Sequence, residues 1–378
     1  MNSRQLINAL IVLVILTVVS FFVFRKDKSS WKQGDDTKST TLIKKLNVNL
    51  VSGVSIRTPK GTLELKKNDN GKWMVSGIGK GYPADFSKLS SLLLRIKDME
   101  VTQMPRVLHS QFSSLKLISP IGNSDTDSTG IQLTLTGKKG ETLFSMIAGA
   151  KHFPEKDNSS PVLSAPEPDG RYILLSGKKQ PLLIHDPFKE LVTDPLSWID
   201  RTFVKMADIV SIELADSQGK KKWRIYRHDV NEPWTLDGLK KTEKPLPRPM
   251  MEATSVFGNI DFDNVYPAPE HIETFQYILT LITQHGQKYK MKINPSDKKV
   301  FLSVSVSSVT AGNLQKQKNT PQQPAAEESL QTDKFYSEWV YEFPLYKLAR
   351  VLKDRRDFYR PIAPQKQQLK KLSAEKPD

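Results

Sequence analysis

The stretch Asn70-Gly71-Lys72-Trp73-Met74-Val75-Ser76-Gly77 decides the predicted fold, because its pattern returns as Asn231-Glu232-Pro233-Trp234-Thr235-Leu236-Asp237-Gly238. In each copy an Asn, a Trp, an aliphatic residue and a Gly hold the same places. An Asn-Gly pair between alternating apolar residues is typical of a β-hairpin with a type I′ turn, so a hairpin over residues 63–75 is expected. The return of the pattern predicts an internal repeat.

The residues around the first copy predict short strands and one main helix. Alternating apolar runs lie at residues 54–56 and 63–65. After the glycines of residues 77–81, the residues Phe86, Leu89, Leu92, Leu93 and Ile96 recur at helical spacing. Further strands are predicted at residues 131–135, 142–148, 172–175 and 182–184. Residues 151–171, rich in Pro, Ser, Asp and Gly, predict a long surface loop between two of them.

The same order of elements is predicted after residue 204. Strands are expected at residues 209–214 and 223–226, a helix with Met250, Ala253, Phe257 and Ile260 on one face, and strands at residues 275–281, 289–293 and 300–306. Residues 344–348 match residues 187–191, with Asp357 falling where Asp200 does. Chance can produce one such match between hairpins, but a duplicated unit explains all of them together.

These observations predict an α+β fold in which an N-terminal transmembrane helix precedes two related modules of antiparallel strands with one main helix each. We expect the first module at residues 42–203 and the second at residues 204–360. A Gln- and Pro-rich insertion at residues 312–334 of the second module is expected to be disordered, and residues 361–378 to form a charged tail.

The N-terminus predicts a membrane anchor. Residues 6–24 are apolar except for Asn8, Thr17 and Ser20, and a helix of that length spans about 28 Å, the thickness of a bilayer core. The run ends in Phe21-Phe22-Val23-Phe24-Arg25-Lys26 without a small-residue cleavage site, which favours a transmembrane signal-anchor at residues 1–24 over a cleaved signal peptide. Residues 25–41, polar and charged, predict a stalk.

The orientation of the anchor is open to two interpretations. Arg25, Lys26, Lys28 and Lys32 follow the apolar run and, by the positive-inside rule, favour a cytoplasmic body. Long domains after an N-terminal signal-anchor are nevertheless exported largely regardless of such charges. We expect a single-pass protein of the bacterial inner membrane whose bulk is periplasmic, with the lipid bilayer as a partner through residues 6–24.

Composition excludes several classes of site. The chain has no Cys, which removes disulfides, thiolate metal sites, iron–sulfur clusters and Cys nucleophiles. Its formal net charge of +15 favours anionic surfaces or polymers as partners. The basic residues are spread along the chain, with short clusters such as Lys220-Lys221-Lys222, and no aromatic-interleaved basic stripe is visible, so nucleic acid is an unlikely partner.

The first half resembles the family catalogued as domain of unknown function 4340, a membrane-anchored bacterial group. The residues that carry the resemblance are Gly71-Lys72-Trp73, Tyr82-Pro83-Ala84-Asp85, Asp169-Gly170-Arg171-Tyr172 and Trp198-Ile199-Asp200-Arg201. It covers residues 42–203 well and the second half more loosely. The resemblance implies an exported, membrane-tethered α+β protein of unestablished activity, and some relatives accompany gliding-motility-type ABC transporters, which implies a transporter-accessory role.

The sequence offers no catalytic, cofactor-binding or metal-binding residues that we would assign. The six histidines His109, His152, His185, His228, His271 and His285 show no metal-binding spacing. Ser-x-x-Lys occurs at Ser29, Ser113, Ser176 and Ser296 without companion motifs. Residues 125–130 imitate the start of a calcium loop, but position twelve is Thr136 and not Glu. The glycines of residues 77–81 lack a complete phosphate-binding pattern.

Three functions remain as hypotheses. The first is a non-catalytic binding or scaffold protein that acts through protein–protein interaction, with a membrane complex such as an ABC transporter as partner and exposed sheet edges or the loop at residues 151–171 as binding surfaces. The second is an extracytoplasmic hydrolase, for which Asp261, Asp263 and His271 are the candidate cluster. The third is a binder of anionic cell-envelope polymer. We favour the first, in which the protein is not an enzyme and needs no cofactor.

Overall fold

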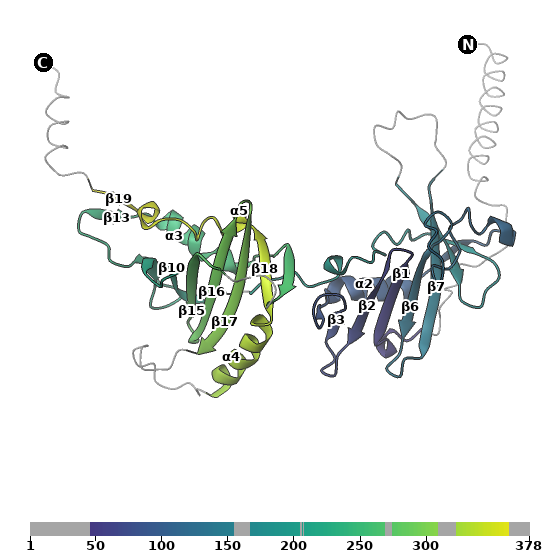
Figure 1. Cartoon of the computed structure of the whole chain (residues 1–378), viewed down its shortest axis with the longest axis horizontal. Coiled ribbons are helices and arrows are strands. Elements are labelled where there is room, and N and C mark those ends of the chain that lie inside the picture. Colours follow the sequence, from purple (N-terminus) through teal and green to yellow (C-terminus); the bar gives the residue numbers. More distant parts are fainter. Residues whose placement is uncertain are drawn as a thin grey trace, which may run out of the picture. The chain divides into compact units, whose positions relative to one another are not determined.

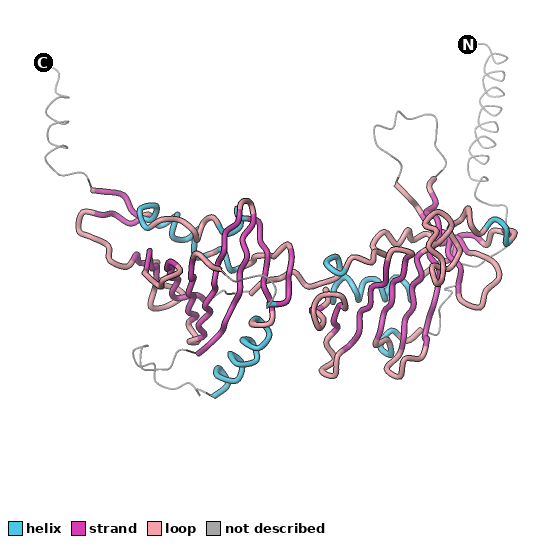
Figure 2. Tube along the Cα trace, viewed as in Figure 1, coloured by secondary structure: helices cyan, strands magenta, loops and turns pink. Residues whose placement is uncertain are grey.

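A computed structural model describes residues 46–154, 167–204, 206, 208–268, 274–308 and 323–362. Strands predominate in this part of the chain, and helices are few (Figure 2). The fold consists mainly of antiparallel sheets, as in the register of β1 with β6 and of β16 with β17. The predicted combination of antiparallel strands and few helices is therefore confirmed at this level.

The first sheet has nine strands in the order β4-β3-β2-β1-β6-β7-β8-β9-β5. Its strands are β1 (Gly53–Thr58), β2 (Gly61–Lys67), β3 (Trp73–Val75), β4 (Tyr82–Pro83), β5 (Val101–Gln103), β6 (Ile131–Thr136), β7 (Thr142–His152), β8 (Gly170–Leu175) and β9 (Leu182–Ile184). The helices in this part of the chain are α2 (Phe86–Lys97) and the 3-10 turns η1 (Val48–Leu50), η2 (His109–Gln111) and η3 (Pro195–Ser197).

The second sheet has eight strands in the order β12-β11-β10-β15-β16-β17-β18-β14, of which β15 to β18 lie side by side in Figure 1. Its strands are β10 (Ile209–Asp216), β11 (Lys221–Tyr226), β12 (Thr235–Leu236), β14 (Asn264–Pro267), β15 (Tyr277–Thr283), β16 (Gln287–Ser296), β17 (Lys299–Ser308) and β18 (Trp339–Pro344). Strands β13 (Glu243–Pro245) and β19 (Tyr359–Pro361) form a separate pair. The helices are α3 (Pro247–Thr254), α4 (Gln323–Tyr336), α5 (Leu345–Leu348), η4 (Val256–Gly258) and η6 (Arg355–Phe358).

The two sheets share one strand order. From β3 to β5 the first sheet reads β3-β2-β1-β6-β7-β8-β9-β5, and the second reads β12-β11-β10-β15-β16-β17-β18-β14. If the strands of each sheet are numbered by their rank along the chain, with β4 and β13 set aside, the two series are identical. Along the chain, α2 lies between β3 and the edge strand β5, and α3 lies between β12 and the edge strand β14.

The density of contacts divides the chain into two compact units. One consists of residues 1–64 and 90–193, and the other of residues 65–89 and 194–378. The boundaries between the two units fall within β2, within α2 and after residue 193. Residues 65–89 and 194–203 thus belong to the second unit, whereas the predicted first module contained them.

The predicted apolar stripe of α2 is present in part. Leu89, Leu92, Leu93 and Ile96 are buried, as expected, whereas Phe86 is 63% exposed. The buried residues have the spacing i, i+3, i+4, i+7, so the stripe that faces the core begins at Leu89 and the first residue of the helix lies outside it.

The predicted hairpin over residues 63–75 is confirmed, but its turn is of a different type. Strands β2 and β3 pair Leu65 with Val75. The Gly71 N–H donates to Asn68 O at 2.9 Å, the Asn68 N–H donates to Lys72 O at 2.8 Å, and within this turn only Gly71 has a positive φ, +75°. A type I′ turn needs two such residues, so this is a type I turn closed by a glycine bulge. The turns at residues 137–141 and 216–220 make the same pair of hydrogen bonds.

Several predicted segments lie outside the described residues. They are the anchor at residues 1–24, the stalk at residues 25–41, most of the loop at residues 151–171, residues 312–322 of the insertion, His271 and residues 363–378 of the tail. Within the ranges that the structure covers, no helix is both long and apolar enough to cross a membrane.

The last part of the predicted disordered insertion is helical. Residues 323–334 belong to α4, which ends in the aromatic pair Phe335 and Tyr336. Strand β18 pairs with β17 only over residues 299–303, and beyond it the Asp333 carboxylate accepts the Val306 N–H at 2.6 Å. Helix α4 therefore covers a strand edge that would otherwise be free, a tertiary reason for order that the Gln- and Pro-rich composition did not indicate.

Candidate functional site

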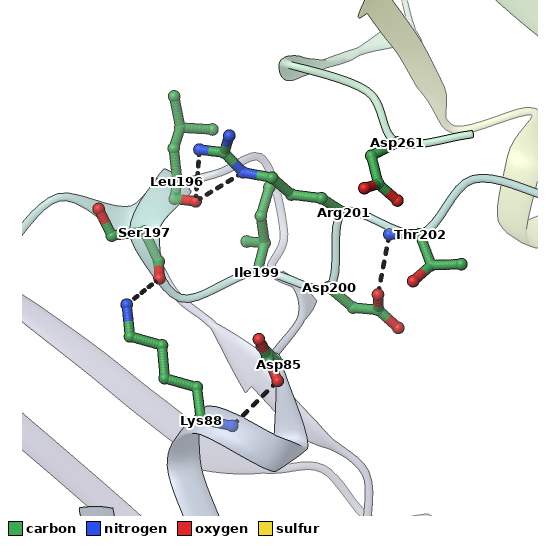
Figure 3. Close-up of a pocket in the computed structure, with 9 residues that line it drawn as sticks. All are labelled: Asp85, Lys88, Leu196, Ser197, Ile199, Asp200, Arg201, Thr202 and Asp261. Carbon is green, nitrogen blue, oxygen red and sulfur yellow. Dashed lines mark hydrogen bonds between the residues drawn. The ribbon is translucent and has the colours of Figure 1, made fainter. Parts of the chain in front are cut away.

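An open hollow of about 470 Å³ lies in the unit formed by residues 65–89 and 194–378. Its walls come from the start of α2, the segment after η3 and one residue that follows η4 (Figure 3). The lining residues are Asp85, Lys88, Leu196, Ser197, Ile199, Asp200, Arg201, Thr202 and Asp261. Charged side chains dominate this lining, which makes the hollow the first candidate for a site.

The start of α2 is tied to the segment around Trp198. The Asp85 carboxylate accepts the Lys88 N–H at 3.0 Å, which satisfies a free amide of the first helical turn. The Asp85 N–H donates to Trp198 O at 2.7 Å. The Lys88 ammonium donates to Ser197 O at 2.5 Å and lies 4.6 Å from the centre of the Trp198 ring. Each of these groups thus stabilises the local structure.

The segment that forms the opposite wall is held by its own hydrogen bonds (Figure 3). The Arg201 guanidinium donates to Leu196 O from Nε at 3.3 Å and from Nη2 at 3.0 Å. The Asp200 carboxylate accepts the Thr202 N–H at 2.9 Å, and the Asp200 N–H donates to Pro83 O at 3.0 Å. These polar groups fix the backbone that carries them, and we therefore interpret the hollow as a structural junction.

The candidate hydrolase cluster is brought together only in part. Asp261 and Asp263 are exposed on either side of the buried Phe262. Lys347 lies between them, because its ammonium donates to Asp261 O at 2.7 Å and is 3.4 Å from an oxygen of Asp263. His271 lies outside the described residues.

The histidines of the described residues are dispersed. His109, His185, His228 and His285 are exposed, and His152 binds Asp169 at 2.7 Å where β7 and β8 leave the sheet. Across the residues that the structure covers, no group of three or more His, Asp or Glu is placed to hold a metal ion. The predicted absence of a metal site remains a prediction for the whole chain.

The other motifs of the sequence are engaged in local structure. In the segment that imitates a calcium loop, the Asp125 carboxylate accepts the Asp127 N–H at 2.9 Å and the Ser128 hydroxyl, which lowers the pKa of Asp125. Gly79 packs closely, since a Cβ at that position would lie 3.1 Å from the Trp339 ring. The Ser-x-x-Lys pairs at Ser113, Ser176 and Ser296 are exposed at both positions.

A cluster of charges around Arg95 was not predicted from the sequence. The Arg95 guanidinium on α2 binds both oxygens of Asp186, at 2.6 Å through Nε, and Glu190 at 2.5 Å. These hydrogen bonds, led by the one to Asp186, raise the pKa of Arg95. The ring of Phe188, a buried residue with φ of +43°, lies 5.1 Å from the guanidinium. The partners are far apart in the sequence, so no local pattern signals them.

Arg171 adds a second guanidinium to this cluster. It is 6% exposed, donates to Phe188 O at 3.1 Å, and burial lowers its pKa. Its Nε is buried and has no hydrogen-bond partner among the described residues. Together, Arg95 and Arg171 fix the backbone around Phe188 against α2 and β8, which is a structural role.

Replacing Arg95 by Met should lower the free energy of unfolding by about 1–2 kcal/mol, because Asp186 and Glu190 lose their shared cation in a partly exposed network. Urea denaturation at neutral pH measures the change. Arg248→Met is the matched control, since Arg248 is 90% exposed and pairs only with Glu252 one turn away, so a change within about 0.5 kcal/mol is expected. Equal effects of the two substitutions would show that the Arg95 cluster is not a stabilising network.

The described residues thus form polar clusters with structural roles and a charged face on the second sheet, and no catalytic centre is recognisable among them. In comparisons with known proteins, no family model, no curated protein and no solved structure matches this chain.

Proposed function

We propose that this chain is a membrane-anchored, extracytoplasmic and non-catalytic binding or scaffold protein, built from two related modules and accessory to a membrane complex of the ABC-transporter type. The anchor rests on the apolar residues 6–24, and the transporter context on the resemblance of residues 42–203 to the domain of unknown function 4340 family.

The common strand order of the two sheets is the observation that carries the two-module part of the proposal. Eight strands of each sheet follow one connectivity, including the same long connection to the edge strand, β5 or β14. If the two sheets had arisen independently, the same connectivity would have had to arise twice, whereas a duplication requires it to arise once. A doubled sheet also supports a binding role, because two modules present edges and faces that can contact a partner.

Two further correspondences support duplication. The Asp85 N–H donates to Trp198 O at 2.7 Å before α2, and the Leu246 N–H donates to Phe358 O at 2.8 Å before α3. Val75 and Leu236, which hold matching places in the sequence repeat, are both buried. These hydrogen bonds support an alignment of Trp198 with Phe358, which differs from the predicted match of Asp357 with Asp200.

Mild detergent extraction of the tagged full-length chain should recover a transporter permease with it, and external protease should degrade the body in spheroplasts. Both results follow if residues 6–24 span the membrane and the modules fold outside it. A chain shortened by residues 1–24 should move to the soluble fraction and lose the partner. Recovery of the full-length chain without any membrane partner would contradict the accessory role, and a protected body would contradict the exported orientation.

A further inference from the structure

One face of the second sheet carries a row of lysines. Lys288, Lys290 and Lys292 stand at alternate positions of β16, while Tyr289 and Met291 between them are buried on the opposite face. Alternate residues of a strand lie about 6.4–6.8 Å apart, so three ammonium groups follow one another along this strand at that spacing. Lys290 and Lys292 are exposed and Lys288 is half-buried.

Each of these lysines has a serine directly opposite on β17. The register pairs Lys288 with Ser307, Lys290 with Ser305 and Lys292 with Ser303. We call these six residues the Lys–Ser ladder. The Cα atoms of such pairs lie about 4.5–5.5 Å apart, close enough for one ammonium and one hydroxyl to bind the same anionic group. Strands β16 and β17 run side by side in Figure 1.

Among the described residues, no ion pair neutralises the charge of the ladder. None of the three lysines pairs with a carboxylate there, and Lys292 lies 5.1 Å from the centre of the Phe275 ring. The described carboxylates of the other strands of this sheet and of α4 have partners of their own, as Glu342 has in Lys299 at 2.8 Å. Asp333 accepts the Val306 N–H at the edge of β17, and Glu213 on β10 is paired in register with Arg224.

One structural reason for strand lysines does not apply here. Lysines often protect edge strands from aggregation, but β16 lies inside the sheet between β15 and β17. The solvated face of an antiparallel sheet is expected to carry polar residues, and the alternation in β16 fits such a face. Three like charges in one row nevertheless repel each other, a cost that neutral polar residues would avoid.

The first sheet supplies an internal comparison. There β7 takes the place of β16, and its residues Ser145 and Ile147 pair with Thr134 and Gln132. In the second sheet the strand of the same rank, β16, carries Lys290 and Lys292, paired with Thr280 and Ile278. The common strand order thus does not require a basic row, and the lysines are particular to the second sheet.

We propose that the Lys–Ser ladder binds a linear, base-free phosphodiester polymer. Three successive bonds of an extended chain span about 3.3–3.6 Å. A polymer with six bonds between neighbouring phosphorus atoms, such as poly(glycerol phosphate), therefore has a repeat of about 7 Å, which matches the spacing of alternate residues along β16. Each rung offers an ammonium and a hydroxyl to one phosphate; the Ser305 hydroxyl donates to Lys290 O at 3.3 Å and has to turn away from that oxygen to donate to a phosphate. Within β16 the one ring between the lysines, Tyr289, lies buried on the opposite face, and the Phe275 ring beside the ladder is covered by the Lys292 ammonium at 5.1 Å, so no free ring face along the lysines is offered to a base by these residues. The inference does not depend on the proposed membrane partner.

Titration of the full-length chain in detergent with fluorescent poly(glycerol phosphate) tests the proposal. Replacing Lys288, Lys290 and Lys292 together by Ser should weaken binding about ten-fold or more, since each exposed ion pair contributes about a factor of two to five. The slope of log K against log salt should fall by about 2, at roughly 0.7 per lysine as for single strands. Replacing the same three lysines by Arg keeps the charges and should retain affinity within about three-fold.

The matched control is the triple replacement of Lys138, Lys139 and Lys178 by Ser, which removes the same charge from exposed turns of the first sheet. It should change affinity less than two-fold. Equal losses in the two Ser variants would overturn the proposal, because general charge and not the ladder would then bind the polymer. Tighter binding of single-stranded DNA with the same number of phosphates would overturn the assignment to a base-free polymer. Loss of binding in the Arg variant would also count against an electrostatic ladder.

Discussion

Replacing Trp198 by Ala is expected to lower the free energy of unfolding by about 3–5 kcal/mol. The Trp198 side chain is fully buried, and the Lys88 ammonium covers its ring at 4.6 Å. Removing the indole leaves a cavity beside the first turn of α2 and removes the partner of that ammonium. Urea denaturation followed by tryptophan fluorescence and by circular dichroism measures the loss.

Phe358→Ala tests whether the second module uses the corresponding place in the same way. Phe358 is fully buried, packs edge-on against Trp223 at 5.0 Å and accepts the Leu246 N–H before α3. A loss of similar size is expected. Tyr346→Ala is the control, because Tyr346 is 73% exposed and its removal should cost less than about 0.5 kcal/mol. If Phe358→Ala behaved like the control, the two positions would not be equivalent.

The local elements were accessible from the sequence because they depend on short-range patterns. The strands from β6 to β9 and from β15 to β17 lie where apolar residues alternate or run together, and α2 lies where apolar residues recur at helical spacing. The hairpin at residues 63–75 was predicted from Asn70-Gly71, yet its turn type was wrong. Asn-Gly is compatible with two turns, and the Asn68 side chain, which accepts the Lys72 N–H at 2.9 Å, stabilises the longer one.

The pairing of distant strands was not accessible in this way. Strand β1 pairs with β6 across some seventy residues, and β5 returns to pair with β9 at the far edge. Such pairs depend on which apolar faces meet in the core, which a single sequence does not specify. The Arg95 cluster and the edge contact of Asp333 were missed for the same reason, because their partners meet only in the folded chain.

The Lys–Ser ladder did leave a signal in the sequence. Gln287-Lys288-Tyr289-Lys290-Met291-Lys292 alternates basic and apolar residues, and Ser303, Ser305 and Ser307 alternate in the next strand. A strand with this period places all its lysines on one face. A search for clusters of consecutive basic residues misses this row of lysines, because on a strand only alternate residues lie on the same face.

The protein should also lose stability steeply above pH 10, because two buried tyrosines and one half-buried tyrosine of the second unit must stay neutral. Burial raises the pKa of Tyr336 to about 12 and raises the pKa values of Tyr82 and Tyr341 above their ordinary value of 10. Tyr82 packs on Phe262 at 5.8 Å, and Tyr341 packs on Phe203 at 4.9 Å. In the unfolded chain these hydroxyls ionise near pH 10.

The sign follows from the protons bound in each state. Between pH 10 and the raised pKa values the folded protein keeps protons that the unfolded chain releases, so the contribution is complete below pH 10 and is lost as the pH rises. Each tyrosine contributes a slope of about 1.4 kcal/mol per pH unit in that window. Urea denaturation at several pH values from 9 to 12 measures the combined slope.

Tyr341→Phe removes one of these hydroxyls while it keeps the buried ring. The slope of unfolding free energy against pH should then become shallower by up to about 1.4 kcal/mol per pH unit. Tyr346→Phe, at an exposed position, should leave the slope unchanged. Lysines also titrate in this range, but they do so equally in all three proteins, so the difference between the variants isolates the tyrosine. An unaltered slope in Tyr341→Phe would mean that Tyr341 ionises freely in the folded protein, and that the aromatic cluster of α4 and β18 is open to water.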